Sequence, residues 1–275
     1  MQAINRDNFG FGEFVWFVGV VEDVNDPIKG GRVRVRIFGY HTEDIPLDDL
    51  PWALVASPTT SSSTGGIGTT PHALIVGTHV IGFFTDGHSA QLPMIMLSYP
   101  GVTGGSSDIH KIADMTRIER TPPMTVSGEG GWSEKTATGQ SRYPNNKVTH
   151  TTSGHTIEVD DTPGNSRLNI QHSSGTFAEM HDDGSMVIHT MNDSYNITEG
   201  NVHIKSTGNV SISVDGNVYE QISGNKKTVI AGNYEIICTN MMINTRNFYF
   251  LNVGTTSFMR SGGVTSIQGS LILLN

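Results

Sequence analysis

Hydrophobic and polar residues alternate along much of the chain, which predicts short strands. The clearest case is Arg32-Val33-Arg34-Val35-Arg36-Ile37, whose three apolar side chains share one face of an extended segment. Further strands are expected at 16–21, 52–56, 78–84 and 93–97. Five short strands separated by turn residues predict a small Greek-key barrel of the oligonucleotide/oligosaccharide-binding (OB) type over residues 1–100.

A second pattern with a period of eight residues occupies the C-terminal half. Gly-Asn pairs begin at Gly200, Gly208, Gly216, Gly224 and Gly232, and each pair predicts a turn. An even period keeps the two-residue alternation of a strand in register, whereas a helix would drift. With each Gly as position one, 11 of the 15 side chains at positions three, five and seven are apolar. These predicted core residues are Val202, Ile204, Val210, Ile212, Val214, Val218, Ile222, Ile230, Tyr234, Ile236 and Cys238.

Such an octad has one apolar face, and a single chain has nothing to cover that face. Several chains wound about a common axis would turn these faces inward and leave no open lateral edge. Burying eleven apolar side chains contributes on the order of 15–35 kcal/mol per chain before conformational entropy is subtracted. We therefore expect an all-β chain whose residues 144–275 form an intertwined β-helix or β-prism needle. Residues 101–143 would be a connector, and 109–120 are compatible with a short helix.

Composition narrows the function classes. The formal net charge is −9, which disfavours phosphate backbones, so we expect no nucleic-acid partner. The single cysteine, Cys238, cannot form an intrachain disulfide. No signal peptide is predicted, because residues 1–14 lack an uncharged apolar core, and no apolar run reaches the length of a spanning helix. The sequence predicts synthesis in a cytoplasm.

Candidate chemistry is sparse, and we predict no catalytic residue, no cofactor and no metal ion. The eleven histidines suggest ligands, but His203 falls at an outward octad position. Asp160 and Asp161 precede Thr-Pro-Gly, which favours a turn over a catalytic pair. The aromatic residues Trp16, Trp52, Phe83 and Phe84 suggest core packing or a protein contact more than a base-stacking surface.

Two sets of motifs stand out along the chain. The first set, in the barrel region, is Trp16-Phe17-Val18-Gly19-Val20-Val21-Glu22-Asp23, Asp26-Pro27, Gly31-Arg32-Val33-Arg34-Val35, Leu50-Pro51-Trp52 and Gly65-Gly66-Ile67-Gly68. The second set, in the needle region, is Tyr143-Pro144-Asn145-Asn146, Ser153-Gly154-His155, Asp160-Asp161-Thr162-Pro163-Gly164 and the octads. These motifs resemble the central spike proteins of contractile-tail phage baseplates. The barrel pattern is similar to the one that opens the barrel of the tail-associated lysozymes of T4-like phages, and the needle motifs resemble those of the VgrG spikes of type VI secretion.

The resemblance implies a homotrimer whose barrels surround the base of the needle and attach to a ring-shaped hub protein under the tail tube. It implies a virion location in the baseplate and transient contact with a Gram-negative outer membrane, which the needle punctures during contraction. T4-like spikes carry a lysozyme domain between barrel and needle. Residues 100–143 leave no room for that fold, so the chain is expected not to be an enzyme.

The C-terminus is apolar, and the resemblance implies a small tip protein there. We expect Leu271, Ile272, Leu273 and Leu274 to form a flat tip platform where three ends meet. Alternative functions are a type VI spike, a glycan-binding adhesin and a cell-wall hydrolase. Phage tail, tailocin and type VI origins remain open, although the short connector and Asp-Asp-Thr-Pro-Gly favour a phage.

Overall fold

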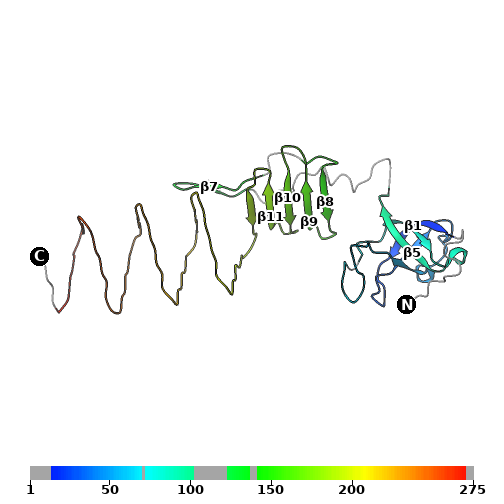
Figure 1. Ribbon diagram of the computed structural model, residues 1–275, viewed down its shortest axis with the longest axis horizontal. Helices are drawn as coiled ribbons and strands as arrows, with labels where there is room; N and C mark the ends of the chain where they lie inside the picture. Colours follow the sequence, from blue (N-terminus) through cyan, green and yellow to red (C-terminus); the bar gives the residue numbers. More distant parts are fainter. Residues whose placement is uncertain (1–13, 70–71, 102–122, 137–140, 271–275) are drawn as a thin grey trace. The chain divides into compact units, whose positions relative to one another are not determined.

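The computed structural model describes residues 14–69, 72–101, 123–136 and 141–270 (Figure 1). Strands and two short 3-10 turns are the regular elements of these ranges. The N-terminal strands are β1 (Trp16–Asp23), β2 (Val33–Ile37), β3 (Trp52–Val55), β4 (His79–Phe84) and β5 (Pro93–Tyr99), with 3-10 turns at Leu47–Asp49 and Gly87–Ser89. The later strands are β6 (Thr125–Val126), β7 (Trp132–Ser133), β8 (Asn146–His150), β9 (Thr156–Asp160), β10 (Arg167–Gln171), β11 (Phe177–His181) and β12 (Met186–His189).

The first five strands close into a barrel in the order β1-β2-β3-β5-β4. All neighbours are antiparallel except β3 and β5, which run parallel. The barrel encloses a compact apolar core, because alternate residues of each strand point inward. The buried core residues are Phe17, Val21, Val33, Val35, Ile37, Ala53, Val80, Phe84 and Ile95. The predicted OB barrel is confirmed, and each of its five strands lies within two residues of the expected range.

The register between β4 and β5 shifts at a β-bulge between Ile81 and Gly82, where Met96 of β5 has no opposite residue on β4. A side chain at Gly82 would overlap the carbonyl oxygen of Met94 and crowd the ring of Phe17. Only glycine therefore fits at this position of β4, between Phe17 of β1 and Met94 of β5. Bulges of this kind increase the local twist that a small barrel needs in order to close.

Strands β8 to β12 form a second sheet, an antiparallel meander in sequence order. Its register is regular, with Glu158 opposite Asn169 and Asn169 opposite Glu179. Four tight turns connect the strands, and each holds a glycine with positive φ: Gly154, Gly164, Gly175 and Gly184. The two-residue strands β6 and β7 pair with each other within the predicted connector. The compatible helix at 109–120 falls outside the described residues.

No strand is assigned between residues 190 and 270, where every residue is exposed. The backbone bends at regular intervals there, at 199–200, 207–208, 215–216, 223–224 and 231–232. These bends contain Gly200, Gly208, Gly216, Gly224 and Gly232. In Figure 1 the chain from residue 214 onward turns back at each bend and runs straight between bends. The needle assembly and the domain limits at 100 and 143 stay predictions.

Candidate functional site

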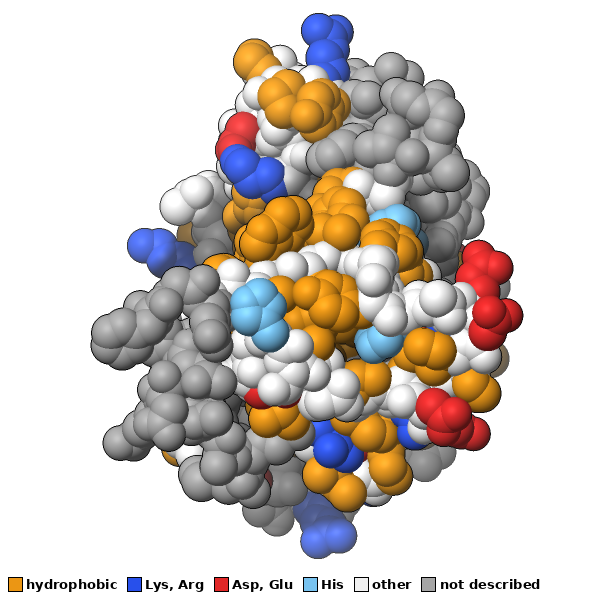
Figure 2. Space-filling view, turned by 90° about the vertical axis from the view of Figure 1, so that its right-hand side faces the viewer, with side chains coloured by type: hydrophobic (Ala, Val, Ile, Leu, Met, Phe, Trp, Pro, Cys, Tyr) orange, Lys and Arg blue, Asp and Glu red, His pale blue; other side chains and the backbone are white. Residues whose placement is uncertain are grey.

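The outer surface of the barrel carries a cluster of apolar and aromatic side chains on β1, β4 and β5. Trp16 is paired with Phe83 across the strands, and the rings of Phe14 and Phe83 lie 5.1 Å apart. His79 stacks obliquely between Tyr99 and Phe38, at centroid distances of 5.5 and 6.4 Å. Figure 2 views the chain from the barrel end and shows hydrophobic side chains and histidines on the surface that faces the viewer. Together these side chains form an apolar surface suited to contact with another protein.

The four aromatic residues considered from sequence have different roles. Phe84 is a core residue and Trp16 is 61% exposed. Trp52 is half-buried beneath two guanidinium groups, those of Arg32 and Arg34, which lie 5.4 and 4.8 Å from its ring centroid. Its ring face is therefore occupied by the protein's own cations.

Asp26 organises the turn that follows β1. Its carboxylate accepts hydrogen bonds from the backbone N–H groups of Ile28, Gly30 and Arg32 and from the Arg32 side chain. The Arg32 guanidinium, helped by these N–H groups, holds the pKa of Asp26 well below its usual range although burial opposes this. The hydrogen bonds to Asp26 therefore hold together the turn that contains Asp26-Pro27 and Gly30-Gly31 and that leads into β2.

The β8–β12 sheet has a polar covered face, which sequence analysis did not predict. Arg167 donates to both oxygens of Glu158, at 3.1 and 2.8 Å, and to the hydroxyl of Ser141. Asn146 also donates to Glu158, at 2.6 Å. The side chains of Arg167 and Glu158 are only 1% and 5% exposed. The network therefore joins residue 141 of the connector to three neighbouring strands.

Further polar groups extend this network along the sheet. Burial raises the pKa of Asp160, but hydrogen bonds from Thr162 and Ser141 outweigh it and lower the pKa overall. Glu179 is fully buried, with His181 Nε2 3.4 Å from its carboxylate. Glu134 of the connector lies 3.0 Å from His189 Nδ1. Asp160 thus belongs to a buried structural network, whereas Asp161 is exposed and pairs with Lys147.

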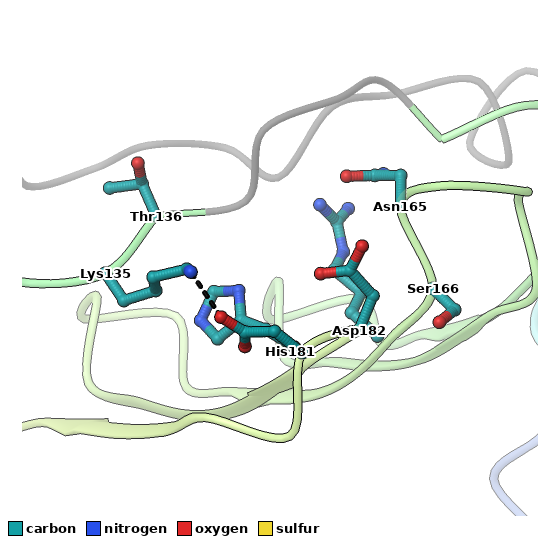
Figure 3. Close-up of a pocket in the computed structure, with 8 residues that line it drawn as sticks. Lys135, Thr136, Asn165, Ser166, His181 and Asp182 are labelled. Atoms are coloured by element: carbon teal, nitrogen blue, oxygen red, sulfur yellow. Dashed lines mark hydrogen bonds and ion pairs between the residues drawn. The ribbon is translucent and has the colours of Figure 1, made fainter.

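A small polar pocket of about 120 Å³ lies at the turn between β11 and β12. Figure 3 shows its lining residues from the connector and from two turns, with Lys135 paired to Asp183. That lysine lowers the pKa of Asp183. In the described part of the chain, the carboxyl groups whose pKa departs from its ordinary value, Asp26, Asp160 and Asp183, all shift downward. General acids that work near neutral pH have raised pKa values, so these groups suit ion pairing better than proton donation.

A larger hollow of about 590 Å³ lies beside the Ser/Thr/Gly loop of the barrel. Backbone groups, hydroxyls, His72 and small apolar residues line it, without any carboxylate among its lining residues. Two carboxyl groups facing a cleft are what glycoside hydrolysis requires. No group of three or more metal-ligating side chains occurs within the described ranges.

The other face of the β8–β12 sheet is apolar and uncovered in the single chain. Cross-strand pairs place Ile157 beside Ile170 and Leu168 beside Met180. Ile170 is 62% exposed and Ile188 is 70% exposed. The sheet therefore buries its charged face and exposes its hydrophobic face, the reverse of a free-standing soluble sheet.

The predicted core residues of the octads are also exposed in the single chain, from Val202 to Cys238. The structure brings none of them together, so their role in a shared core stays a prediction. The predicted tip platform, 271–274, lies outside the described residues. In the part of the chain that the structure covers, no helix is long and apolar enough to cross a membrane.

Comparisons with known proteins place these features in context. The family model of the Gp5 N-terminal OB domain matches residues 39–171. Protein Gp5 of Vibrio phage KVP40 is 29% identical over 260 residues, which cover 71% of this chain and 62% of that protein. The pre-baseplate central spike protein Gp5 of Enterobacteria phage T4 is 47% identical over 79 residues, or 26% of this chain and 14% of that protein. The chain thus spans less than two thirds of either relative. The resemblance found in the sequence motifs is confirmed: this chain is similar to Gp5 proteins of phages, among them the pre-baseplate central spike protein of phage T4.

Proposed function

We propose that this protein is the central spike of a contractile phage baseplate and that it works as a homotrimer. The OB barrel would dock on the hub, and the octad region would form a needle that punctures the outer membrane during contraction. Similarity to Gp5 proteins supports the baseplate role. The exposed apolar faces of the single chain support the trimer.

The apolar face of the β8–β12 sheet is the observation that carries the proposal. It presents a continuous set of large side chains to solvent: Ile157, Val159, Leu168, Ile170, Met180, Met186 and Ile188. Each contributes about 1.5–3 kcal/mol when it is fully buried. A soluble monomer would not retain so large an exposed apolar patch, whereas a symmetric trimer would bury it around its axis.

The octads continue the same arrangement. Their inward positions are mostly apolar, their bends recur every eight residues, and every residue from 200 to 239 is exposed in the single chain. Three chains that supply these faces in register would close a prism with no free lateral edge. Since each octad would support its neighbours, the assembly would be stiff along its axis, as mechanical puncture requires.

The apolar cluster on β1, β4 and β5 fits the hub contact. It combines exposed aromatic rings with few charges at its centre, the composition of a protein–protein interface core. In this proposal the barrel binds through Trp16, Phe83, His79 and Tyr99. A small tip protein would bind at the opposite end of the chain.

Sedimentation at a series of concentrations tests the assembly. We expect a species of three times 29.7 kDa, about 89 kDa, that does not dissociate on dilution to the lowest measurable concentration. A monomer at all concentrations would contradict the spike assembly. Activity on peptidoglycan would favour the hydrolase alternative, and activity is measured on the same sample.

A further inference from the structure

The bends of the C-terminal repeats show a one-residue shift in register. Bends at 223–224 and 231–232 are eight residues apart, as are those at 246–247, 254–255 and 262–263. The step from the bend at 231 to the bend at 246, however, is 15 residues, one short of two octads, and the intermediate bend at 239 lies eight residues after 231 and seven before 246. Because strand side chains alternate with a period of two, the shift exchanges the faces on which odd-numbered and even-numbered residues lie. Inward positions are even-numbered up to Cys238 and odd-numbered from Met241.

Side-chain exposure follows this assignment. From residue 241 onward the odd-numbered large apolar residues, such as Ile243 and Val253, are 45–79% exposed. The even-numbered ones are 78–92% exposed. The even-numbered members are Met242, Phe248, Phe250, Phe258 and Val264. Both faces of this region therefore carry large apolar side chains.

The earlier octads differ sharply on their outward face. Among the twenty outward positions of the five Gly-Asn octads, only Tyr219, Val229, Ala231 and Ile237 are apolar. The remainder are polar or charged. A trimer that buries its inward positions would thus have a polar surface along the early octads and an aromatic surface over residues 242–264.

Charge distinguishes this aromatic surface further. Residues 239–270 contain Arg246 and Arg260 and no Asp, Glu or Lys. Both arginines are even-numbered, so they share the outward face with the three phenylalanines. A region of local charge +2 therefore occurs in a chain whose net charge is −9.

We propose that this outer belt (Met242, Arg246, Phe248, Phe250, Phe258, Arg260 and Val264) binds an anionic lipid surface. Aromatic side chains partition into the membrane interface, and arginines bind headgroup phosphates. Residues 239–270 contain no carboxylate side chain, so they lack the repulsion from anionic headgroups that the acidic remainder of the chain would experience. The inference rests on the proposed function, since the trimer defines which face is outward, and it adds the chemistry of the surface that the needle meets.

Vesicle binding by the full-length protein tests the belt. The probes are vesicles of equimolar phosphatidylglycerol and phosphatidylcholine, and vesicles of phosphatidylcholine alone. We expect the trimer to co-sediment with the anionic vesicles, and F248S/F250S/F258S to weaken this binding at least about tenfold. The matched control is Y219S/V229S/I237S, which removes three outward apolar side chains outside the belt and should bind as the parent does. R246Q/R260Q should weaken binding to anionic vesicles at least about tenfold and leave the neutral vesicles unaffected.

Sedimentation without vesicles separates the possible failures. A stable trimer that ignores anionic vesicles, or whose binding survives F248S/F250S/F258S, would overturn the lipid belt and leave the spike assembly standing. Association of trimers that the same triple variant abolishes, without vesicle binding, would assign the belt to a second trimer and overturn the inference. A monomer would overturn the assembly and the belt together.

Discussion

The barrel and the octad region use the same alternation of apolar and polar residues to opposite effect. In the barrel, alternate residues such as Val33, Val35 and Ile37 are at most 1% exposed, because five strands close on themselves. In the octads, Val210, Ile212 and Val214 alternate in the same way and remain at least 50% exposed. Alternation creates an apolar face, and chain topology decides whether one chain can cover it.

The β8–β12 sheet lies between these two cases. Its five strands pair in sequence order, yet its covered face is polar and its apolar face is open. Strand pairing supplies backbone hydrogen bonds without supplying a partner for the hydrophobic side chains. The sheet is therefore intermediate between the barrel, which covers its own apolar face, and the octads, whose residues are all exposed in the single chain.

The largest expected effect is loss of assembly after Ile212→Asp. A carboxylate at this inward octad position would enter the proposed shared core three times per trimer, at a cost of several kcal/mol for each ion. We expect sedimentation to show dissociation at concentrations where the parent stays trimeric. Ser213→Asp places the same charge on the next, outward residue and should leave the trimer intact. Equal stability of the two variants would contradict the assignment of faces.

Next in size is the effect of Phe84→Ala, which acts inside the barrel. The ring is 1% exposed and lies 4.9 Å from Phe17 and 5.0 Å from Tyr40. Its removal should lower the free energy of unfolding of the barrel by about 3–5 kcal/mol. Urea unfolding followed by tryptophan fluorescence measures this loss, and Trp16→Ala is the exposed control. Since the barrel closes by itself, the variant should remain trimeric; dissociation would show that the two regions are coupled.

The barrel could be predicted from sequence because its signals are local. Val33, Val35 and Ile37 alternate strictly, and Gly30-Gly31 and Asp26-Pro27 mark the turn before them. The barrel then closes because closure covers the apolar faces of all five strands at once. The Asp26 network was not foreseen, because the residue type favours a turn without revealing which donors surround it.

Two features of the later chain could not be derived in the same way. In Arg167-Leu168-Asn169-Ile170-Gln171 the alternation is clear, but it does not say which face the connector covers. The structure buries Arg167 and Asn169 and leaves Leu168 and Ile170 exposed. The register shift before Asn247 was missed because Gly-Asn pairs no longer mark the turns there.

A third prediction concerns the charged network beneath the β8–β12 sheet. Arg167→Met would leave Glu158 buried without its cation, at a cost of about 3 kcal/mol. The value lies at the low end for such changes because Asn146 and Ser141 can still donate to the carboxylate. Hydrogen exchange of the β9 and β10 amides should report the weakening.

Two further variants sharpen this test. The double variant E158Q/R167M removes both charges and should recover part of the lost protection. Lys147→Met breaks only the exposed pair with Asp161 and should cost less than about 1 kcal/mol. If the β9 and β10 amides of E158Q/R167M were less protected from hydrogen exchange than those of R167M, hydrogen bonding and not charge compensation would govern the stability of the network.

The smallest expected effect belongs to the Asp26 turn, and it depends on pH. Because the pKa of Asp26 is lowered in the folded barrel, its contribution to stability is fully present above the ordinary aspartate pKa of about 4. That contribution is lost as pH falls through this value toward the lowered folded pKa. Asp26→Asn should therefore cost about 1.5–3 kcal/mol at pH 7, since the carboxylate accepts several hydrogen bonds there. Unfolding at a series of pH values should show parent and variant converging below about pH 4.

Asp48→Asn is the control, because Asp48 pairs with Arg34 while 95% exposed and should change stability by less than about 1 kcal/mol. A difference between parent and D26N that stays constant down to acid pH would mean that the turn depends on the shape of the side chain and not on its charge.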